Sequence, residues 1–174
     1  MLCIVYSGED KELHTEQLIE KILSKDMYKR CFHPMQHMVM KRHGQLFVVA
    51  RKLLPGYVFI ETDYPDQVRD ALDEAHIIPL FSNKEFVPYM SDEESKVFTS
   101  IIDEAGLVPL SVATTRKDEN GRTRANFLSG PLSNIADRVT KVDFTKRKAY
   151  IDSGLSLFFT YDGEQVSGEK FWRD

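Results

Sequence analysis

The sequence has few cysteines and no long hydrophobic run. Cys3 and Cys31 are its only two cysteines among 174 residues. Two cysteines without metal-type partners fit a reducing compartment better than a disulfide framework. No apolar run approaches the length of a membrane span, and Glu9 and Asp10 interrupt the apolar start too soon for a signal peptide. We therefore expect a cytoplasmic protein without a membrane segment.

Motifs of common catalytic sites are also missing. The sequence contains no glycine-rich phosphate loop, no nucleophile elbow and no helix-borne zinc pair. Cys31, His33 and His37 form the one cluster with metal-capable side chains. On a strand these three share a face but lie too far apart to bind one ion, and Pro34 argues against a helix that would gather them. We expect no enzyme, no cofactor and no metal.

Charge is distributed unevenly along the chain. The formal net charge is −4, which argues against a general nucleic-acid coat protein. Residues 116–150, however, carry nine lysines and arginines against four acidic residues. A basic stretch on an acidic protein indicates a directed patch with a defined partner.

The stretch around Pro55 and Gly56 organises the first part of the chain. The Pro-Gly pair breaks the backbone pattern, and the four β-favouring residues of 57–60 follow it. Alternation places Tyr57 and Phe59 on one face and Val58 and Ile60 on the other. If Val58 and Ile60 face helices, Tyr57 and Phe59 face outward and need a partner. A core strand buried on both faces is the alternative.

Apolar periodicity predicts the order of elements up to Gly106. The capping box at Ser91–Glu94 marks the start of one helix, and Pro65 marks another. The order indicates an α+β fold, with an α/β sandwich in which helices cover one face of an antiparallel sheet. The expected strands are 2–6, 31–40, 46–50, 57–61 and 77–81, and the expected helices run over 11–26, from Pro65, and from 92 until Gly106.

Beyond Gly106 the pattern changes to short strands. Residues 116–122 are polar and contain an Asn-Gly pair, which is typical of a linker or a hairpin tip. Strands are predicted at 138–144, 148–153 and 155–161, and this spacing fits a small β-barrel. We expect a first domain at 1–106, a linker at 107–126 and a barrel at 127–174.

The densest basic group lies in this second part. Phe144 and Tyr150 are close to it in the sequence, and cations next to aromatic rings suit phosphates and unpaired bases. We expect this group to bind nucleic acid; a solvated turn is the alternative. A basic turn at 42–45 could also touch a nucleic-acid backbone. The group consists of Arg138, Lys141, Lys146, Arg147 and Lys148.

Three motifs, in order along nearly the whole chain, resemble the NusG family of transcription elongation factors. They are Tyr6-Ser7-Gly8-Glu9, Leu54-Pro55-Gly56-Tyr57-Val58-Phe59-Ile60, and Ser129-Gly130-Pro131-Leu132 followed by Val139–Val142. The last of these is similar to a KOW motif. The resemblance implies an N-terminal domain that binds RNA polymerase, followed by a small KOW-type β-barrel.

The resemblance implies partners for both parts. Tyr57 and Phe59 would receive the β′ clamp helices of RNA polymerase, with Ile77, Ile78 and Phe81 as weaker neighbours. The KOW-type domain would bind nascent RNA, such as a hairpin, as in LoaP-type antiterminators. A general elongation factor that binds Rho or a ribosomal protein is an alternative, and so is a free-standing RNA-binding protein. In each case we expect a monomer.

The sequence departs from the family pattern in two places. Met1–Ile4 lacks the usual Trp-Tyr opening. Asp137 stands where the KOW motif has a glycine, and aspartate tolerates a left-handed backbone better than most residues. Phe171 and Trp172 either cap the barrel or pack on the first domain, which would give a closed state as in the RfaH branch.

Overall fold

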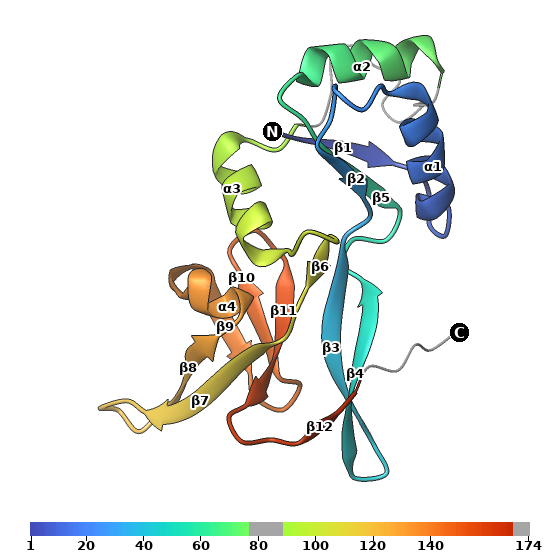
Figure 1. Cartoon of the computed structure of the whole chain (residues 1–174). Helices are drawn as coiled ribbons and strands as arrows, with labels where there is room; N and C mark the ends of the chain where they lie inside the picture. The colour runs from blue at the N-terminus through green and yellow to red at the C-terminus, as the bar shows by residue number, and fades with distance from the viewer. Residues whose placement is uncertain (77–88, 169–174) are drawn as a thin grey trace. The chain divides into compact units, whose positions relative to one another are not determined.

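The computed structural model describes residues 1–76 and 89–168, and these form two compact units (Figure 1). The first unit consists of Met1–Pro34 and Lys52–Thr99, and the second of Met35–Arg51 and Ser100–Asp174. The chain therefore leaves the first unit after Pro34 and returns to it at Lys52. Each unit is described separately below.

The first unit is built on a three-stranded antiparallel sheet. Its strand order is β1 (Leu2–Tyr6), β5 (Tyr57–Glu61) and β2 (Arg30–Phe32), so β5 lies in the middle. Ile60 pairs with Cys3 on one side and with Cys31 on the other. The predicted strand at 31–40 is interrupted at His33 and Pro34, and its second part forms β3 in the other unit.

Two helices pack on the face of this sheet that carries Val58 and Ile60. They are α1 (Glu12–Ile22) and α2 (Pro65–Glu74). Ile19 of α1 and Val68 of α2 are completely buried in the shared cluster. Burial of each such side chain contributes about 1.5–3 kcal/mol. Helix α1 is shorter than predicted because Leu23 adopts an extended backbone, whereas α2 begins at Pro65 as predicted.

A third helix, α3 (Asp92–Ile101), covers the opposite face of the sheet through Phe98, which stacks on Phe59. The predicted capping box is confirmed: the Ser91 Oγ accepts the Glu94 N–H at 3.2 Å, and the Glu94 carboxylate accepts the Ser91 N–H at 3.0 Å. The expectation that helices cover only one face is wrong. The face with Phe59 is also apolar, so the apolar stripe of α3 covers it.

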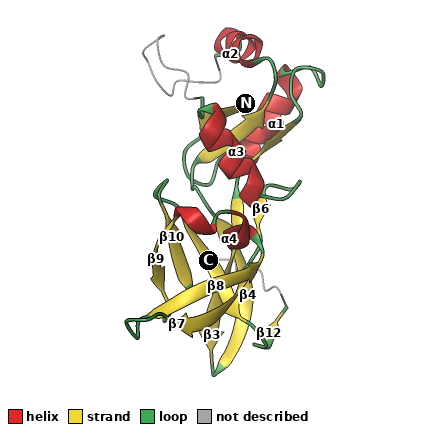
Figure 2. Ribbon diagram, turned by 90° about the vertical axis from the view of Figure 1, so that its left-hand side faces the viewer, coloured by secondary structure: helices red, strands yellow, loops and turns green. Residues whose placement is uncertain are grey.

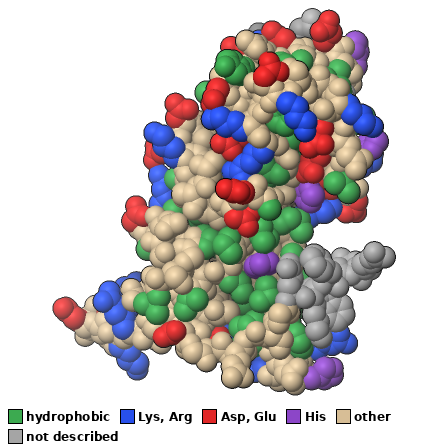
Figure 3. Space-filling view, in the orientation of Figure 1, with side chains coloured by type: hydrophobic (Ala, Val, Ile, Leu, Met, Phe, Trp, Pro, Cys, Tyr) green, Lys and Arg blue, Asp and Glu red, His purple; other side chains and the backbone are tan. Residues whose placement is uncertain are grey.

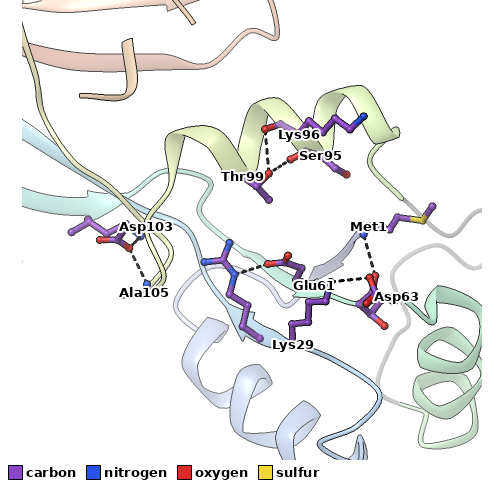
Figure 4. Close-up of polar contacts among 12 residues, drawn as sticks. Met1, Lys29, Glu61, Asp63, Ser95, Lys96, Thr99, Asp103 and Ala105 are labelled. Atoms are coloured by element: carbon purple, nitrogen blue, oxygen red, sulfur yellow. Dashed lines mark hydrogen bonds and ion pairs between the residues drawn. The ribbon is translucent and has the colours of Figure 1, made fainter. Parts of the chain in front are cut away.

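Two ion pairs join the segment at the start of β2 to the segment at the end of β5 (Figure 4). Arg30 Nε lies 2.7 Å from Glu61 Oε2, and Lys29 Nζ lies 2.9 Å from Asp63 Oδ1. The Lys29 N–H also donates to the Glu61 carbonyl at 2.7 Å. These contacts hold β2, a strand of only three residues, in register.

The second unit consists mainly of strands (Figure 2). One sheet has the order β8-β7-β11-β10-β9, in which β11 and β7 are parallel. The other has the order β12-β4-β3-β6. The strands are β3 (Met35–Arg42), β4 (Gln45–Lys52), β6 (Leu107–Val108), β7 (Ser111–Lys117), β8 (Thr123–Ser129), β9 (Val139–Asp143), β10 (Lys148–Ile151), β11 (Ser156–Tyr161) and β12 (Val166–Ser167).

The predicted C-terminal strands are confirmed as β9, β10 and β11, with bounds one or two residues apart. The range 107–126, expected as a linker, instead contains β6, β7 and the start of β8, because the polar residues 116–122 form a hairpin tip rather than a connection. Within the described residues, β8 and β9 lie at the two ends of the sheet order, so the KOW-type barrel is not confirmed. The predicted strand 77–81 lies outside the described residues, as do Phe171 and Trp172.

The Ser-Gly-Pro-Leu motif forms a tight corner after β8. Gly130 has φ 81°, and Pro131 opens the short helix α4 (Pro131–Asn134). The Leu132 N–H donates to the Ser111 Oγ at 2.9 Å, which ties this corner to the start of β7. Asp137 lies in the 3-10 helix η1 (Ala136–Arg138), so the left-handed backbone expected there is not formed.

Candidate functional site

The turn at Pro55 and Gly56 is fixed by hydrogen bonds from three directions. Gly56 has φ 82°, and its N–H donates to Glu12 Oε1 at 2.7 Å. Its carbonyl accepts the Ser7 N–H at 2.7 Å and the Ser7 hydroxyl at 3.2 Å. A Cβ at this position would lie 2.7 Å from Tyr6 Cε2. Glycine is therefore required both for the backbone conformation and for the position of the Tyr6 ring.

A buried carboxylate supports this turn from inside the first unit. Glu12 is 2% exposed, and its second oxygen accepts a hydrogen bond from Lys52 Nζ at 2.9 Å. Lys52 also pairs with Asp10 at 2.6 Å. Burial raises the pKa of Glu12, but the hydrogen bonds from Gly56 and Lys52 outweigh it and leave this pKa below its ordinary value. The carboxylate is thus held in its charged form.

Two tyrosines lie side by side next to this turn. Tyr6 and Tyr57 are paired across β1 and β5, with ring centroids 5.2 Å apart and an angle of 55° between the rings. Tyr6 is 42% exposed and Tyr57 is 37% exposed. The structure therefore presents two aromatic rings to solvent on a turn that hydrogen bonds hold in place.

Phe59, predicted to share this outward surface, is buried instead. It is 1% exposed and stacks on Phe98 at 4.8 Å and on Phe32 at 5.9 Å. Alternation along β5 does place Phe59 on the same face as Tyr57, but α3 covers that face at Phe59. The alternative of a strand buried on both faces is therefore correct from Val58 to Ile60, and Tyr57, the first residue of β5, is the exception.

Three further residues were predicted to contact the polymerase. Ile77, Ile78 and Phe81 lie outside the described residues.

Tyr6, Glu12 and Lys52 were not predicted as site residues. The sequence did contain a signal for Tyr6, because this residue opens the Tyr6–Glu9 stretch that resembles the NusG family. Nothing in the sequence connects Glu12 with Gly56, which lies 44 residues further along the chain.

Two of the predicted basic residues meet aromatic rings on one face of the second unit. Lys148 Nζ lies 5.2 Å from the Tyr150 ring centroid and 5.6 Å from that of Phe158. Lys141 is paired with Tyr150 across β9 and β10, and its Nζ lies 5.7 Å from the same ring. We call these four residues the cation–aromatic face. In such an arrangement the cations can contact phosphates, and the partly exposed rings can stack with bases.

Two of the remaining predicted cations pair with carboxylates. Arg147 pairs with Glu164 at 2.5 Å and lies over the Tyr161 ring. Arg138 lies 3.5 Å from Asp152. Lys146 is exposed, and its backbone N–H donates to Asp143 Oδ1 in the turn between β9 and β10. The five predicted residues therefore do not form one patch.

The structure contains no candidate metal centre among the residues it describes. Cys3 and Cys31 are both free, and burial raises the pKa of the Cys3 thiol to about 12. Burial also raises the pKa of Cys31. His33, from the metal-capable cluster, contacts Glu16 instead, with Nδ1 at 2.6 Å from Oε1. In the described part of the chain, none of the helices has the length and apolarity to cross a membrane.

The fold and the site define a mixed α+β protein that presents a fixed pair of aromatic rings beside a Pro-Gly turn. A family model described as Transcription termination factor nusG matches residues 4–99, which is more than half of the chain, and the protein belongs to the NusG family. Members of this family are non-enzymatic transcription factors and typically bind RNA polymerase. Membership supports a general role in transcription elongation or antitermination. No curated protein matches the chain.

Proposed function

We propose that this protein is a transcription elongation or antitermination factor that binds RNA polymerase through Tyr6 and Tyr57. The observation that carries the proposal is the exposed pair of rings beside Gly56. Aromatic side chains are common hot spots, and rings that are ordered before binding lose less entropy when a partner docks. The NusG family membership supports the same general role.

The partner we propose is the pair of clamp helices in the β′ subunit, as the resemblance to NusG-family proteins implies. Tyr57 would contact these helices directly. Phe59 would act from beneath, because it is buried against Phe98. Ile77, Ile78 and Phe81 remain proposed neighbours of this surface. Binding would stabilise one conformation of the polymerase without any bond chemistry.

The test is a binding titration of the full chain against a β′ clamp-helix hairpin. We expect Tyr57→Ala and Tyr6→Ala each to weaken binding by about tenfold or more. Tyr64→Ala is the matched control, because Tyr64 is 51% exposed in the same unit but lies at the start of α2. The Tyr64→Ala variant should bind the clamp-helix hairpin with the same affinity as the wild type.

Two results would contradict the proposal. One is a folded wild-type protein that does not bind the clamp-helix hairpin. The other is an equal loss in all three tyrosine variants, which would show that these two rings have no special role. Circular dichroism of each variant separates a loss of binding from a loss of folding.

A second partner is favoured by the cation–aromatic face. We propose that the C-terminal part, expected as a KOW-type domain at 127–174, contacts nascent RNA with Lys141 and Lys148 on phosphates and Tyr150 in a stacking position. This would fit a specialised LoaP-type paralogue that acts as a monomer. A general factor that couples to Rho or a ribosomal protein would use the same domain for a protein partner instead.

Salt dependence distinguishes these possibilities. RNA binding that depends on several phosphate contacts weakens steeply as salt rises, whereas docking on Tyr6 and Tyr57 changes little. Lys148→Gln and Tyr150→Ala should weaken binding to an RNA hairpin and leave clamp-helix binding unchanged. RNA binding without any clamp-helix binding would instead indicate a free-standing RNA-binding protein.

A further inference from the structure

The hairpin of β7 and β8 ends in a two-stranded ribbon that carries cations on both strands. All residues from Thr115 to Arg124 are exposed except Asp118, which is half-buried. In both ribbon views the end of the hairpin extends away from the sheet to which it belongs (Figures 1 and 2). Figure 3 shows basic side chains at this end. The cations are Arg116, Lys117, Arg122 and Arg124.

The turn of this ribbon is ordered by one aspartate. Asp118 Oδ1 accepts the N–H groups of Asn120 at 3.0 Å and Arg122 at 2.9 Å, and Oδ2 accepts Arg124 Nε at 2.9 Å. The Asp118 N–H donates to the Arg122 carbonyl at 2.9 Å. The carboxylate is therefore engaged within the turn, and the ribbon does not have to be ordered by a ligand.

The charges on the ribbon do not stabilise the hairpin itself. Arg116 is directly opposite Arg124, and like charges in such a pair are destabilising. The ion pair with Asp118 offsets the repulsion at Arg124. Within the described residues, no ion pair is found for Arg116, Lys117 or Arg122. A local conflict of this kind is expected where the residues serve binding rather than folding.

We propose that this ribbon inserts into the major groove of a B-form DNA duplex. Arg116, Lys117 and Arg122 would contact phosphates. The face that carries Arg116 and Arg124 also carries Thr114 and Asn126, further from the turn, and these polar groups would contact the sugar-phosphate backbone at the mouth of the groove. This inference goes beyond the proposed function, because it involves another surface and does not depend on polymerase binding.

The dimensions of the ribbon favour DNA over the alternatives. At about 3.4 Å per residue, the three residues of each strand before the turn span roughly 10 Å. The major groove of B-form DNA is about 8.5 Å deep and 12 Å wide, and it admits a two-stranded ribbon. The corresponding groove of an RNA duplex is too narrow for side chains. An acidic protein partner would complement the charge of the ribbon, but its binding would not require an extended, narrow shape.

The experiment measures binding of the full chain to a fluorescein-labelled DNA duplex by anisotropy over a range of salt concentrations. The test variant combines Arg116→Gln, Lys117→Gln and Arg122→Gln, and it leaves the Asp118–Arg124 pair intact. The control combines Lys21→Gln, Lys25→Gln and Lys96→Gln, which are exposed and change the net charge equally. RNA duplex and single-stranded RNA of the same sequence, and polyglutamate, are the competing probes.

We expect the test variant to bind the DNA duplex about tenfold more weakly at moderate salt. The plot of log K against log salt should also become shallower, with a slope smaller in magnitude by about three. The control should bind like the wild type. Glu119→Gln should strengthen binding, because Glu119 is an exposed acidic residue beside the cations. Equal losses in the test variant and the control would overturn the proposal, as would absent DNA binding at low salt or tighter binding of either RNA or polyglutamate.

Discussion

Two glycine corners, one in each unit, have nearly the same backbone conformation. Gly56 has φ 82° and Gly130 has φ 81°, and at each a Cβ would approach another heavy atom to 2.7 Å. At Gly56 that atom belongs to the Tyr6 ring. At Gly130 it is the Ser111 Cα, with the Leu110 carbonyl oxygen at 2.8 Å. A ring can turn away but a backbone cannot, so Gly130 determines the fold whereas Gly56 determines a surface.

The largest expected effect is that of Gly130→Ala. We expect a loss of about 3 kcal/mol or more in the free energy of unfolding, because a strained backbone is combined with a clash against backbone atoms. Urea unfolding measures this loss. The control is Gly154→Ala, since Gly154 has φ 83° but no atom within 4 Å of the position that a Cβ would take. Equal losses in the two variants would show that the backbone conformation alone matters.

The second prediction concerns the carboxylate beneath Gly56. Glu12→Gln keeps the shape of the side chain but removes its charge, which weakens the hydrogen bonds from Gly56 and Lys52. We expect a loss of about 2 kcal/mol in the free energy of unfolding at neutral pH. Asp10→Asn is the matched control, because Asp10 contacts the same lysine from an exposed position. An equal loss in both variants would contradict a special role for the buried carboxylate.

The same variant has a pH signature. The pKa of Glu12 is lower in the folded protein than its ordinary value of 4.5. Its stabilising contribution is therefore complete above about pH 4.5 and is lost as the pH falls through the folded-state pKa. The difference between wild type and Glu12→Gln should shrink in acid, as followed by urea unfolding at several pH values. A difference that stays constant across this range would contradict the assignment.

Gly56→Ala should have a smaller effect on stability than Gly130→Ala and a larger one on binding. We expect a loss of roughly 1–2 kcal/mol in the free energy of unfolding, because Tyr6 can rotate away from the new methyl group. The displaced ring should weaken clamp-helix binding. Gly44→Ala is the control, as Gly44 has φ 80° and open space around it. Unchanged binding in a folded Gly56→Ala protein would contradict the role of this corner.

The smallest effect is expected at His33, which contacts a second carboxylate of α1. The hydrogen bond with Glu16 raises the pKa of His33 above its ordinary value of 6.5, although burial opposes this. Its contribution is complete below about pH 6.5 and is lost as the pH rises through the folded-state pKa. We expect His33→Gln to lose about 0.5–1 kcal/mol at pH 6 and less at pH 8. The opposite trend would contradict the ion pair.

Part of this site could be predicted from the sequence. The Pro-Gly break located Tyr57, and alternation correctly separated its face from that of Val58. Burial of Phe59 could not be predicted, because it depends on Phe98, which packs on it from 39 residues further along the chain. The stripe of α3 was recognised, but a stripe does not indicate which face of a sheet it covers.

The second unit shows the same limit. Strand propensity located β9, β10 and β11, and local charge located Lys141 and Lys148. Register then decided which cations meet aromatic rings, since Lys141 faces Tyr150 only because β9 and β10 pair in that way. The Asn-Gly pair allowed a linker or a hairpin tip. The pairing of Arg116 with Arg124 required β7 and β8 to be recognised as partners.

The central place of β5 in the first sheet has a consequence for synthesis of the chain. Strands β1 and β2 are made first, but each pairs with β5 and they do not pair with each other. At about 5–20 residues per second, the thirty or so residues between β2 and the end of β5 delay pairing by roughly 2–6 seconds. During this interval the nascent N-terminal segment has two unpaired strands, and a fragment that ends before Tyr57 cannot form this sheet.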